Sequence, residues 1–155
     1  MKSTARIAEH PIHPMLIPYP FAFLSGALAF RMLASARHDA TFARTADHLR
    51  TAGLATAVLA AAPGIIDYFT ALPDGPPRRT ATSHVIANST ALLCFAAAAV
   101  GGQRGTEDRQ SLTLEAIGTA FLSLGGWLGG KLTYHHHVGV VEDAESGAYA
   151  RIADA

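Results

Sequence analysis

The chain has few charged residues, no excess charge of either sign and a single cysteine. Charged residues make up 15% of its 155 residues, below the roughly 25% of an ordinary soluble domain. Twelve basic residues balance twelve acidic ones, so the composition argues against nucleic acid as a partner. Cys94 lies in an apolar run and, having no second cysteine in the chain, cannot form an internal disulfide. Hydrolase and phosphate-binding motifs are also absent, which argues against an enzyme of those classes.

Long apolar runs dominate what is present. Stretches without a lysine, arginine, aspartate or glutamate cover residues 11–30, 51–66, 80–103 and 116–130. A membrane helix needs about 20 mainly apolar residues, and each run reaches that length with its apolar flanks. We therefore predict an all-α integral membrane four-helix bundle with up-down-up-down topology. The whole chain, residues 1–155, would form a single membrane domain with a polar leader (1–9), spans at about 15–33, 49–72, 80–100 and 112–134, and a polar tail (141–155).

The apolar runs have two other interpretations. A soluble alanine-rich bundle agrees with the modest mean hydropathy of +0.22, but it should show a polar outer face at every third or fourth residue. Residues 54–66 and 91–100 lack such a face. A cleaved signal peptide is the second alternative for the first run, but Pro18 and Pro20 interrupt its apolar centre. Both alternatives are less favoured than four membrane spans.

Prolines and charges predict the segments outside the spans. The pairs His10-Pro11 and His13-Pro14 precede the first span, and proline both lacks a backbone donor and disfavours helical geometry in the residue before it. We therefore expect a non-helical lead-in segment there. Residues 34–48 contain arginines and aspartates, which predicts a loop with room for a short interfacial helix.

Most of the polar side chains near span ends should lie on one side of the membrane. With four alternating spans, the start of the first and third and the end of the second and fourth share a side. The polar residues on that side are His10, His13, Asp67, Tyr68, Arg78, Arg79, His84, Asn88, Lys131, Tyr134, His135, His136 and His137. Asp67 and His84 fall inside spans, where ionisable residues are candidates for function. The opposite side is expected to be ordinary loop.

Several kinds of site agree with this grouping. A haem b with two histidine ligands needs imidazoles from different helices, closely packed glycines and cations near its propionates. The glycines of residues 125–130 could provide the close packing. The two ligands would be His84 with His136 or with His13, and the other residues of the site would be Asn88, Arg78 and Arg79. A zinc or copper site built from His10, His13, Asp67 and His136 is the alternative. A proton relay through Asp67 and His84, or a structural role with no cofactor, would also use these residues.

Four sequence segments, taken in order, resemble a known family. HPIHPMLIPYP, GIIDY, SHVIAN and GGWLGGKLTYHHHVGV are similar to the bacterial predicted membrane proteins called the domain of unknown function 2231 family, over about residues 10–140. The polar residues that match the family pattern are His10, His13, Asp67, His84, Asn88, Tyr134 and His136. His137 stands where the family usually has glycine, so the sequence leaves open which of His135, His136 and His137 matters.

The resemblance implies a multi-pass protein of the bacterial inner (cell) membrane, and it supplies no reaction. Similar proteins are sometimes joined to Rieske-type iron–sulfur domains, which favours electron transfer by analogy. The leading hypothesis is therefore a small b-type cytochrome-like electron-transfer subunit in the lipid bilayer, with a quinone or an iron–sulfur protein as its redox partner. The alternative is a non-haem structural or metal-binding protein. Glycines at four-residue spacing in residues 125–130 would favour a homodimer if they faced outward.

Overall fold

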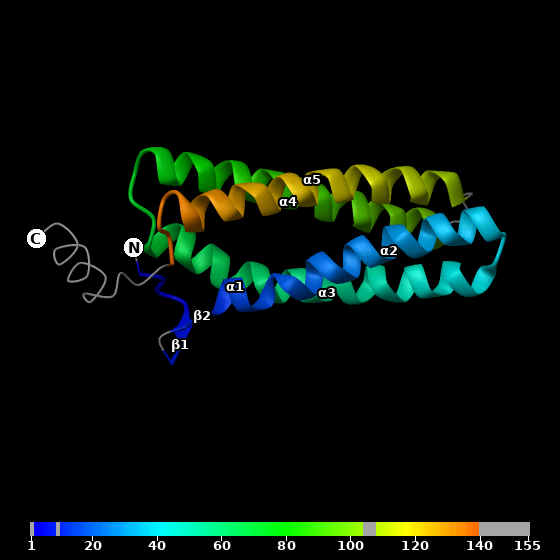
Figure 1. Cartoon of the computed structure of the whole chain (residues 1–155), viewed down its shortest axis with the longest axis horizontal. Helices are drawn as coiled ribbons and strands as arrows, with labels where there is room; N and C mark the ends of the chain where they lie inside the picture. Colours follow the sequence, from blue (N-terminus) through cyan, green and yellow to red (C-terminus); the bar gives the residue numbers. More distant parts are fainter. Residues whose placement is uncertain (1, 9, 104–107, 140–155) are drawn as a thin grey trace, which may run out of the picture.

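The structure is a computed structural model that describes residues 2–8, 10–103 and 108–139. Nearly all of the described chain is helical, and the long helices lie side by side along one axis (Figure 1). In chain order the elements are β1 (Arg6–Ile7), β2 (His10–Pro11), α1 (Ile12–Leu16), α2 (Pro18–Arg37), α3 (Ala40–Thr70), α4 (Pro76–Gln103) and α5 (Asp108–Tyr134). The chain reverses direction between successive long helices (Figure 1). The predicted tail over 141–155 lies outside the described residues.

Among the described residues, four helical stretches are long and apolar enough to cross a membrane. They are Ile12–Arg37, Ala40–Thr70, Pro76–Gly101 and Arg109–Tyr134. Each corresponds to one of the spans expected from the sequence, with boundaries that differ by a few residues at most ends. The predicted all-α membrane protein with several spans is therefore confirmed.

Most of the buried apolar residues are alanines, and many of the large apolar residues face outward. Ala27 and Ala91 are fully buried, whereas Trp127 and Phe69 are 75% and 72% exposed. A soluble bundle would bury the large side chains to remove them from water. In lipid no such force acts between helices, and small residues at the contacts let the backbones approach closely. The distribution of side chains is thus that of a protein dissolved in a bilayer.

The long helices form two hairpins. α2 packs along α3, and α4 packs along α5; the hairpins then meet through α2 with α5 and α3 with α4. Leu24 and Phe95 fill the centre between them, and each side chain lies over a glycine of the other helix in its own hairpin. A Cβ atom on Gly53 would lie 2.5 Å from Leu24, and one on Gly118 would lie 2.9 Å from Phe95.

The expectation of a loop at residues 34–48 is wrong. α2 continues to Arg37 and α3 begins at Ala40, so only His38 and Asp39 lie between them. His38 adopts a left-handed φ of 53° that lets the chain reverse. The carboxylate of Asp39 accepts a hydrogen bond of 2.7 Å from the backbone N–H of Thr41, which caps α3 and lowers the pKa of Asp39. One well-capped helix start therefore outweighs the polar composition of residues 40–48.

The lead-in segment also differs in part from the expectation. His10-Pro11 pairs with Arg6–Ile7 as a short antiparallel ladder, but His13-Pro14 lies within α1. Proline is tolerated there because the first turn of a helix has no partner for its N–H groups. Pro18 likewise occupies the first position of α2. The chain thus enters the first span through a short helix and then a longer one.

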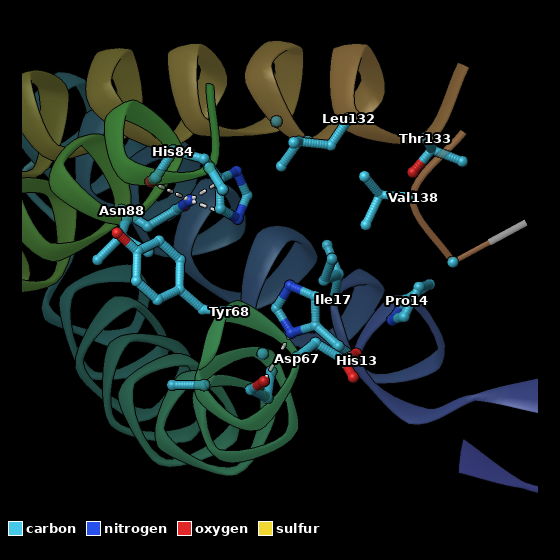
Figure 2. A pocket seen from close by; sticks show the side chains of 18 of the residues that line it. His13, Pro14, Ile17, Asp67, Tyr68, His84, Asn88, Leu132, Thr133 and Val138 are labelled. Atoms are coloured by element: carbon cyan, nitrogen blue, oxygen red, sulfur yellow. Dashed lines mark hydrogen bonds between the residues drawn. The ribbon is translucent and has the colours of Figure 1, made fainter. Parts of the chain in front are cut away.

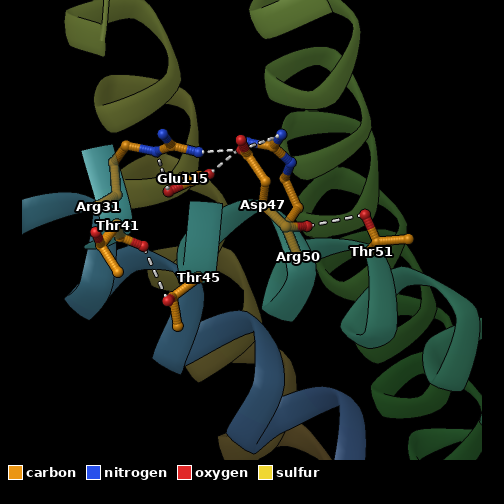
Figure 3. Close-up of polar contacts among 7 residues, drawn as sticks. All are labelled: Arg31, Thr41, Thr45, Asp47, Arg50, Thr51 and Glu115. Atoms are coloured by element: carbon orange, nitrogen blue, oxygen red, sulfur yellow. Dashed lines mark hydrogen bonds and ion pairs between the residues drawn. The ribbon is translucent and has the colours of Figure 1, made fainter. Parts of the chain in front are cut away.

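Three buried charged side chains and the half-exposed Asp47 lie together at the end of the bundle that holds the α2–α3 turn. Arg31 comes from α2, Asp47 and Arg50 from α3, and Glu115 from α5 (Figure 3). Glu115 is 0% exposed, and Arg31 and Arg50 are 4% and 5% exposed. The sequence-based expectation of ordinary loop charges on this side is therefore wrong.

The four side chains form one network of hydrogen bonds and ion pairs. The guanidinium of Arg50 donates to Glu115 Oε1 at 2.8 Å and to Asp47 Oδ1 at 2.7 Å. Arg31 donates to the same oxygen of Asp47 and lies 3.5 Å from Glu115 Oε2. Two positive and two negative groups cancel, which is the condition under which buried charges are tolerated. The network links α2 and α3 to α5 and thereby joins the two hairpins.

Replacing Glu115 by glutamine should destabilise the bundle strongly. The substitution leaves two buried guanidinium groups with Asp47 as their remaining carboxylate in the network, and breaking a buried ion pair costs about 3–5 kcal/mol. The expected result is a clearly lower midpoint of thermal unfolding in detergent. Thr113→Ala, at an exposed position two residues earlier on α5, is the control, and equal midpoints for both variants would contradict a stabilising role of the network.

Candidate functional site

A cavity of about 670 Å³ lies between the two hairpins at the end where the described chain begins and ends. Its walls come from all the long helices and are mainly apolar, with Phe21, Ala57, Leu92 and Leu122 among them. Ser3 and Val138 contribute from the segments next to the two termini. Figure 2 shows His13, Asp67, His84 and other labelled side chains around this space. Of the predicted site residues, His13, Asp67, His84 and Asn88 line the cavity.

His13 enters the cavity from the first hairpin. Its Nδ1 lies 2.7 Å from the backbone carbonyl oxygen of Ala60 on α3. A carbonyl oxygen can only accept, so Nδ1 carries a proton, and in the neutral imidazole Nε2 is then the nitrogen with a lone pair. Gly64 lies one turn after Ala60 and makes room for the ring, because a Cβ atom there would be 2.9 Å from Nδ1 of His13.

His84 enters from the second hairpin in the same way. Its Nδ1 lies 2.8 Å from the backbone carbonyl oxygen of Gly125 on α5, so its Nε2 is also the unprotonated nitrogen. Gly129 lies one turn after Gly125, and a Cβ atom there would come within 3.2 Å of the His84 ring. Each hairpin thus holds one imidazole against a glycine and a backbone carbonyl.

The two imidazoles face one another across the cavity. Their ring centres are 6.1 Å apart, and their planes are nearly perpendicular, at 84°. Figure 2 shows both rings pointing into the cavity from opposite sides. Of the two histidine pairings predicted from the sequence, the structure brings together His84 and His13, and the other partner, His136, lies elsewhere.

Asn88 lies one turn after His84 on α4 and contacts it. Its Nδ2 donates to the backbone carbonyl oxygen of His84 at 2.9 Å and lies 3.3 Å from both ring nitrogens. The amide packs where Gly125 has no side chain, since a Cβ atom on Gly125 would be 2.5 Å from Asn88 Oδ1. The predicted sharing of one helix face by His84 and Asn88 is therefore seen as a direct contact.

Asp67 binds the N-terminal segment. Its Oδ2 accepts from the hydroxyl of Ser3 at 2.7 Å, and its Oδ1 accepts from the backbone N–H groups of Thr4 and Ala5 at 2.8 and 3.0 Å. Nothing in the sequence signals these partners, which are about sixty residues away along the chain. The carboxylate thereby fixes residues 3–5 beside the mouth of the cavity.

His10, His135 and His136 lie at the same end of the bundle as the cavity. Nδ1 of His10 bonds to the carbonyl oxygen of Ala8 at 2.6 Å, and Nε2 of His136 lies 3.2 Å from the hydroxyl of Thr80. The rings of His135 and His136 are in contact, with centres 4.8 Å apart. Burial lowers the pKa of His136, and the charges of His135 and Lys131 lower it further. His136 thereby contacts another helix, α4.

The two arginines proposed from the sequence differ in their surroundings. The guanidinium of Arg78 forms an ion pair with Asp74 at 3.0 Å, donates to the carbonyl oxygen of Leu72 at 2.7 Å and lies over the ring of Tyr68. Arg79 is exposed. Arg78 therefore stabilises the turn between α3 and α4, while Arg79 lies at the surface of the same end.

The predicted metal set is not assembled. Within residues 2–8, 10–103 and 108–139, no three histidine, cysteine, aspartate or glutamate side chains are grouped so that they could hold a metal ion. The physical reason is that Asp67 is used by the N-terminal segment, His10 by Ala8 and His136 by Thr80. His13 alone of the four points to the centre of the cavity.

These features define the class of protein: a multi-pass membrane protein with two histidines that converge in an apolar cavity at one end of its helical bundle. The chain belongs to the DUF2231 family of predicted membrane proteins, whose pattern matches residues 9–142. The resemblance noted in the sequence is thereby confirmed. No curated protein and no solved structure matches the chain.

Glycine replacements should distinguish the two histidine contacts from ordinary helix packing. Gly64→Ala and Gly129→Ala would push His13 and His84 away from their carbonyl partners. Gly130→Ala is the matched control, because a Cβ atom there has its nearest neighbour at 4.0 Å, and alanine favours a helix by about 1 kcal/mol over glycine. We expect changed imidazole NMR signals in the first two variants and unchanged signals in the third. Unchanged signals in all three would contradict the contacts.

The lowered pKa of His136 predicts a pH dependence at the cavity mouth. The folded protein protonates His136 less readily than the unfolded chain, in which a histidine has a pKa of about 6.5. The neutral His136 side chain therefore contributes stability above about pH 6.5, and this contribution is lost as the pH falls. Lys131→Gln should raise the pKa of His136 measured by NMR titration. Lys2→Gln should not, since Lys2 is not among the groups that shift it. A titration unaffected by the Lys131 change would contradict the assigned cause.

Proposed function

We propose that this protein is a small b-type cytochrome-like electron carrier of the membrane, with one haem b held between His13 and His84. The observation that carries the proposal is the pair of facing imidazoles, each bonded through Nδ1 to a backbone carbonyl oxygen. Metal–imidazole bonds are about 2.0 Å long and an imidazole centre lies about 1.1 Å behind its nitrogen, so an axial pair has ring centres about 6.2 Å apart. The measured separation is 6.1 Å.

The number of ligands favours haem over a bare metal ion. A haem iron receives four nitrogens from its macrocycle and needs only two from the protein. A structural zinc ion needs four protein ligands, and a catalytic one needs three. The described residues offer no group of three. Two histidines in an apolar cavity of about 670 Å³ agree better with a large flat cofactor than with a single ion.

The walls of the cavity also support the proposal. Gly126, Gly129 and Gly130 leave a wall of α5 without large side chains, against which a flat macrocycle could lie. The carboxylates of the cofactor would extend to the cavity mouth, where Arg79 is exposed and Arg78 lies beside the α3–α4 turn.

Two protein ligands on one iron leave no open coordination position, which is typical of electron transfer. The protein would then accept and release single electrons while His13 and His84 stay neutral and bound. A quinone in the bilayer or an iron–sulfur protein at the membrane surface remains the proposed class of redox partner. The N-terminal segment held by Asp67 would cover the cavity on the aqueous side.

Titration of the detergent-purified apoprotein with haemin tests the two ligands separately. His13→Ala and His84→Ala should each abolish the low-spin spectrum, because each removes one axial nitrogen. His136→Ala and His38→Ala should retain it. Equal loss in all four variants, or retention in the first two, would contradict the assignment. Binding of one copper ion per chain without haem binding would instead support the metal-binding alternative.

The angle between the rings predicts a spectroscopic signature of the oxidised protein. Axial imidazoles with perpendicular planes give a highly anisotropic low-spin signal in electron paramagnetic resonance, whereas parallel planes give a rhombic one. The 84° angle predicts the anisotropic type. A rhombic signal would contradict the ring orientation while leaving two histidine ligands in place.

A further inference from the structure

The two facing histidines are held by similar backbone contacts but have different neighbours one turn further along the chain. His84 is followed at that distance by Asn88, and His13 is followed by Ile17, whose side chain cannot donate a hydrogen bond. Asn88 is 2.9 Å from the His84 carbonyl oxygen. The two imidazoles are therefore chemically inequivalent, and Asn88 is the source of the difference.

The distances show how the amide lies on the ring. Nδ2 of Asn88 is 3.3 Å from both Nδ1 and Nε2 of His84. In the ring plane, a point equally far from these two atoms would collide with Cε1, so the amide nitrogen lies over the face of the imidazole. The atom next to the His84 carbonyl oxygen must be a donor, which identifies it as the amide nitrogen and not the oxygen.

The contact leaves the ring nitrogens free for their other roles. Nδ1 of His84 donates to Gly125, and the ring lines the cavity. One N–H of Asn88 binds the backbone carbonyl, and the other is directed at the ring face, a weak but directional N–H···π contact. The missing side chain at Gly125 makes the space for the amide. The amide therefore restrains rotation of the imidazole about its Cβ–Cγ bond.

We infer that Asn88 is a positioning residue that fixes the ring plane of His84, that it thereby maintains the bond from Nδ1 to Gly125 that sets the tautomer, and that it weakens electron donation by the ring to the bound iron. The inference rests on the proposed function for its redox part. An N–H group against the ring face withdraws electron density, and a weaker axial donor favours the reduced metal. Asn88 would thus raise the midpoint potential and maintain the perpendicular arrangement of the two rings.

Asn88→Leu and Asn88→Ala test the inference together. Leucine keeps most of the volume and removes the donor, whereas alanine removes both. Ser89→Ala, at the next position on α4, is the control. In the apoprotein, nitrogen NMR of His84 should show a single Nδ1–H form in the wild type and in Ser89→Ala. Both Asn88 variants should show several-fold faster exchange of that proton and an increased share of the other tautomer.

In the haem-loaded protein, both Asn88 variants should have a lower midpoint potential and a paramagnetic resonance signal shifted away from the anisotropic type. An effect of alanine without an effect of leucine would show a packing role and overturn the inference. Unchanged potentials and unchanged NMR signals would also overturn it. If the wild type binds no haem, the proposed function fails, and the apoprotein NMR still decides whether Asn88 positions His84.

Discussion

The buried ionic network of Arg31, Asp47, Arg50 and Glu115 is the interaction on which the arrangement of the two hairpins depends. Helices in a bilayer gain little from burying apolar surface against one another, so a specific contact has to fix their relative position. The network supplies that contact at one end of the bundle. Ten residues of α5 separate Glu115 from Gly125, about 15 Å along the helix. The hairpins are thus joined at one end and enclose a cavity at the other.

The cavity end follows the same principle with backbone groups in place of charges. His13 and His84 each bond to the carbonyl oxygen of a helical residue and lie against the glycine one turn later. A helix carbonyl has two lone pairs, so it can accept this bond in addition to its helical one. Both contacts bridge two helices of one hairpin. The distance between the imidazoles therefore depends on how the hairpins are spaced, to which the ionic network and the core of Leu24 and Phe95 both contribute.

Much of the fold could be predicted from the sequence because long apolar runs have few alternatives. The spans and the common end for Asp67, His84 and their neighbours followed from run length and alternation alone. The sequence pattern did not predict the start of α3 at Ala40, because the capping contact of Asp39 depends on the backbone geometry at His38. The general effect of proline on helices predicted an irregular segment. It therefore indicated neither the ladder formed by His10-Pro11 nor the helical position of His13.

The partners of the site residues could not be predicted, since they depend on contacts between distant segments. The attachment of residues 3–5 to Asp67 and the choice of His13 as the partner of His84 are of this kind. The sequence does, however, contain a pattern that indicates the ionic network. Glu115 continues the spacing of Ser111, Gly118 and Leu122, which are all buried on α5. Arg50 likewise continues the spacing of buried residues on α3, so its position indicated the interior.

The visible spectrum of the purified protein, expressed with ample haem precursor and recorded before and after dithionite, tests the central claim most directly. The account predicts an intense Soret band, sharpened visible bands on reduction, and one iron per chain. A colourless protein without iron, obtained from a correctly folded and haem-supplied preparation, would contradict the claim that His13 and His84 are haem ligands.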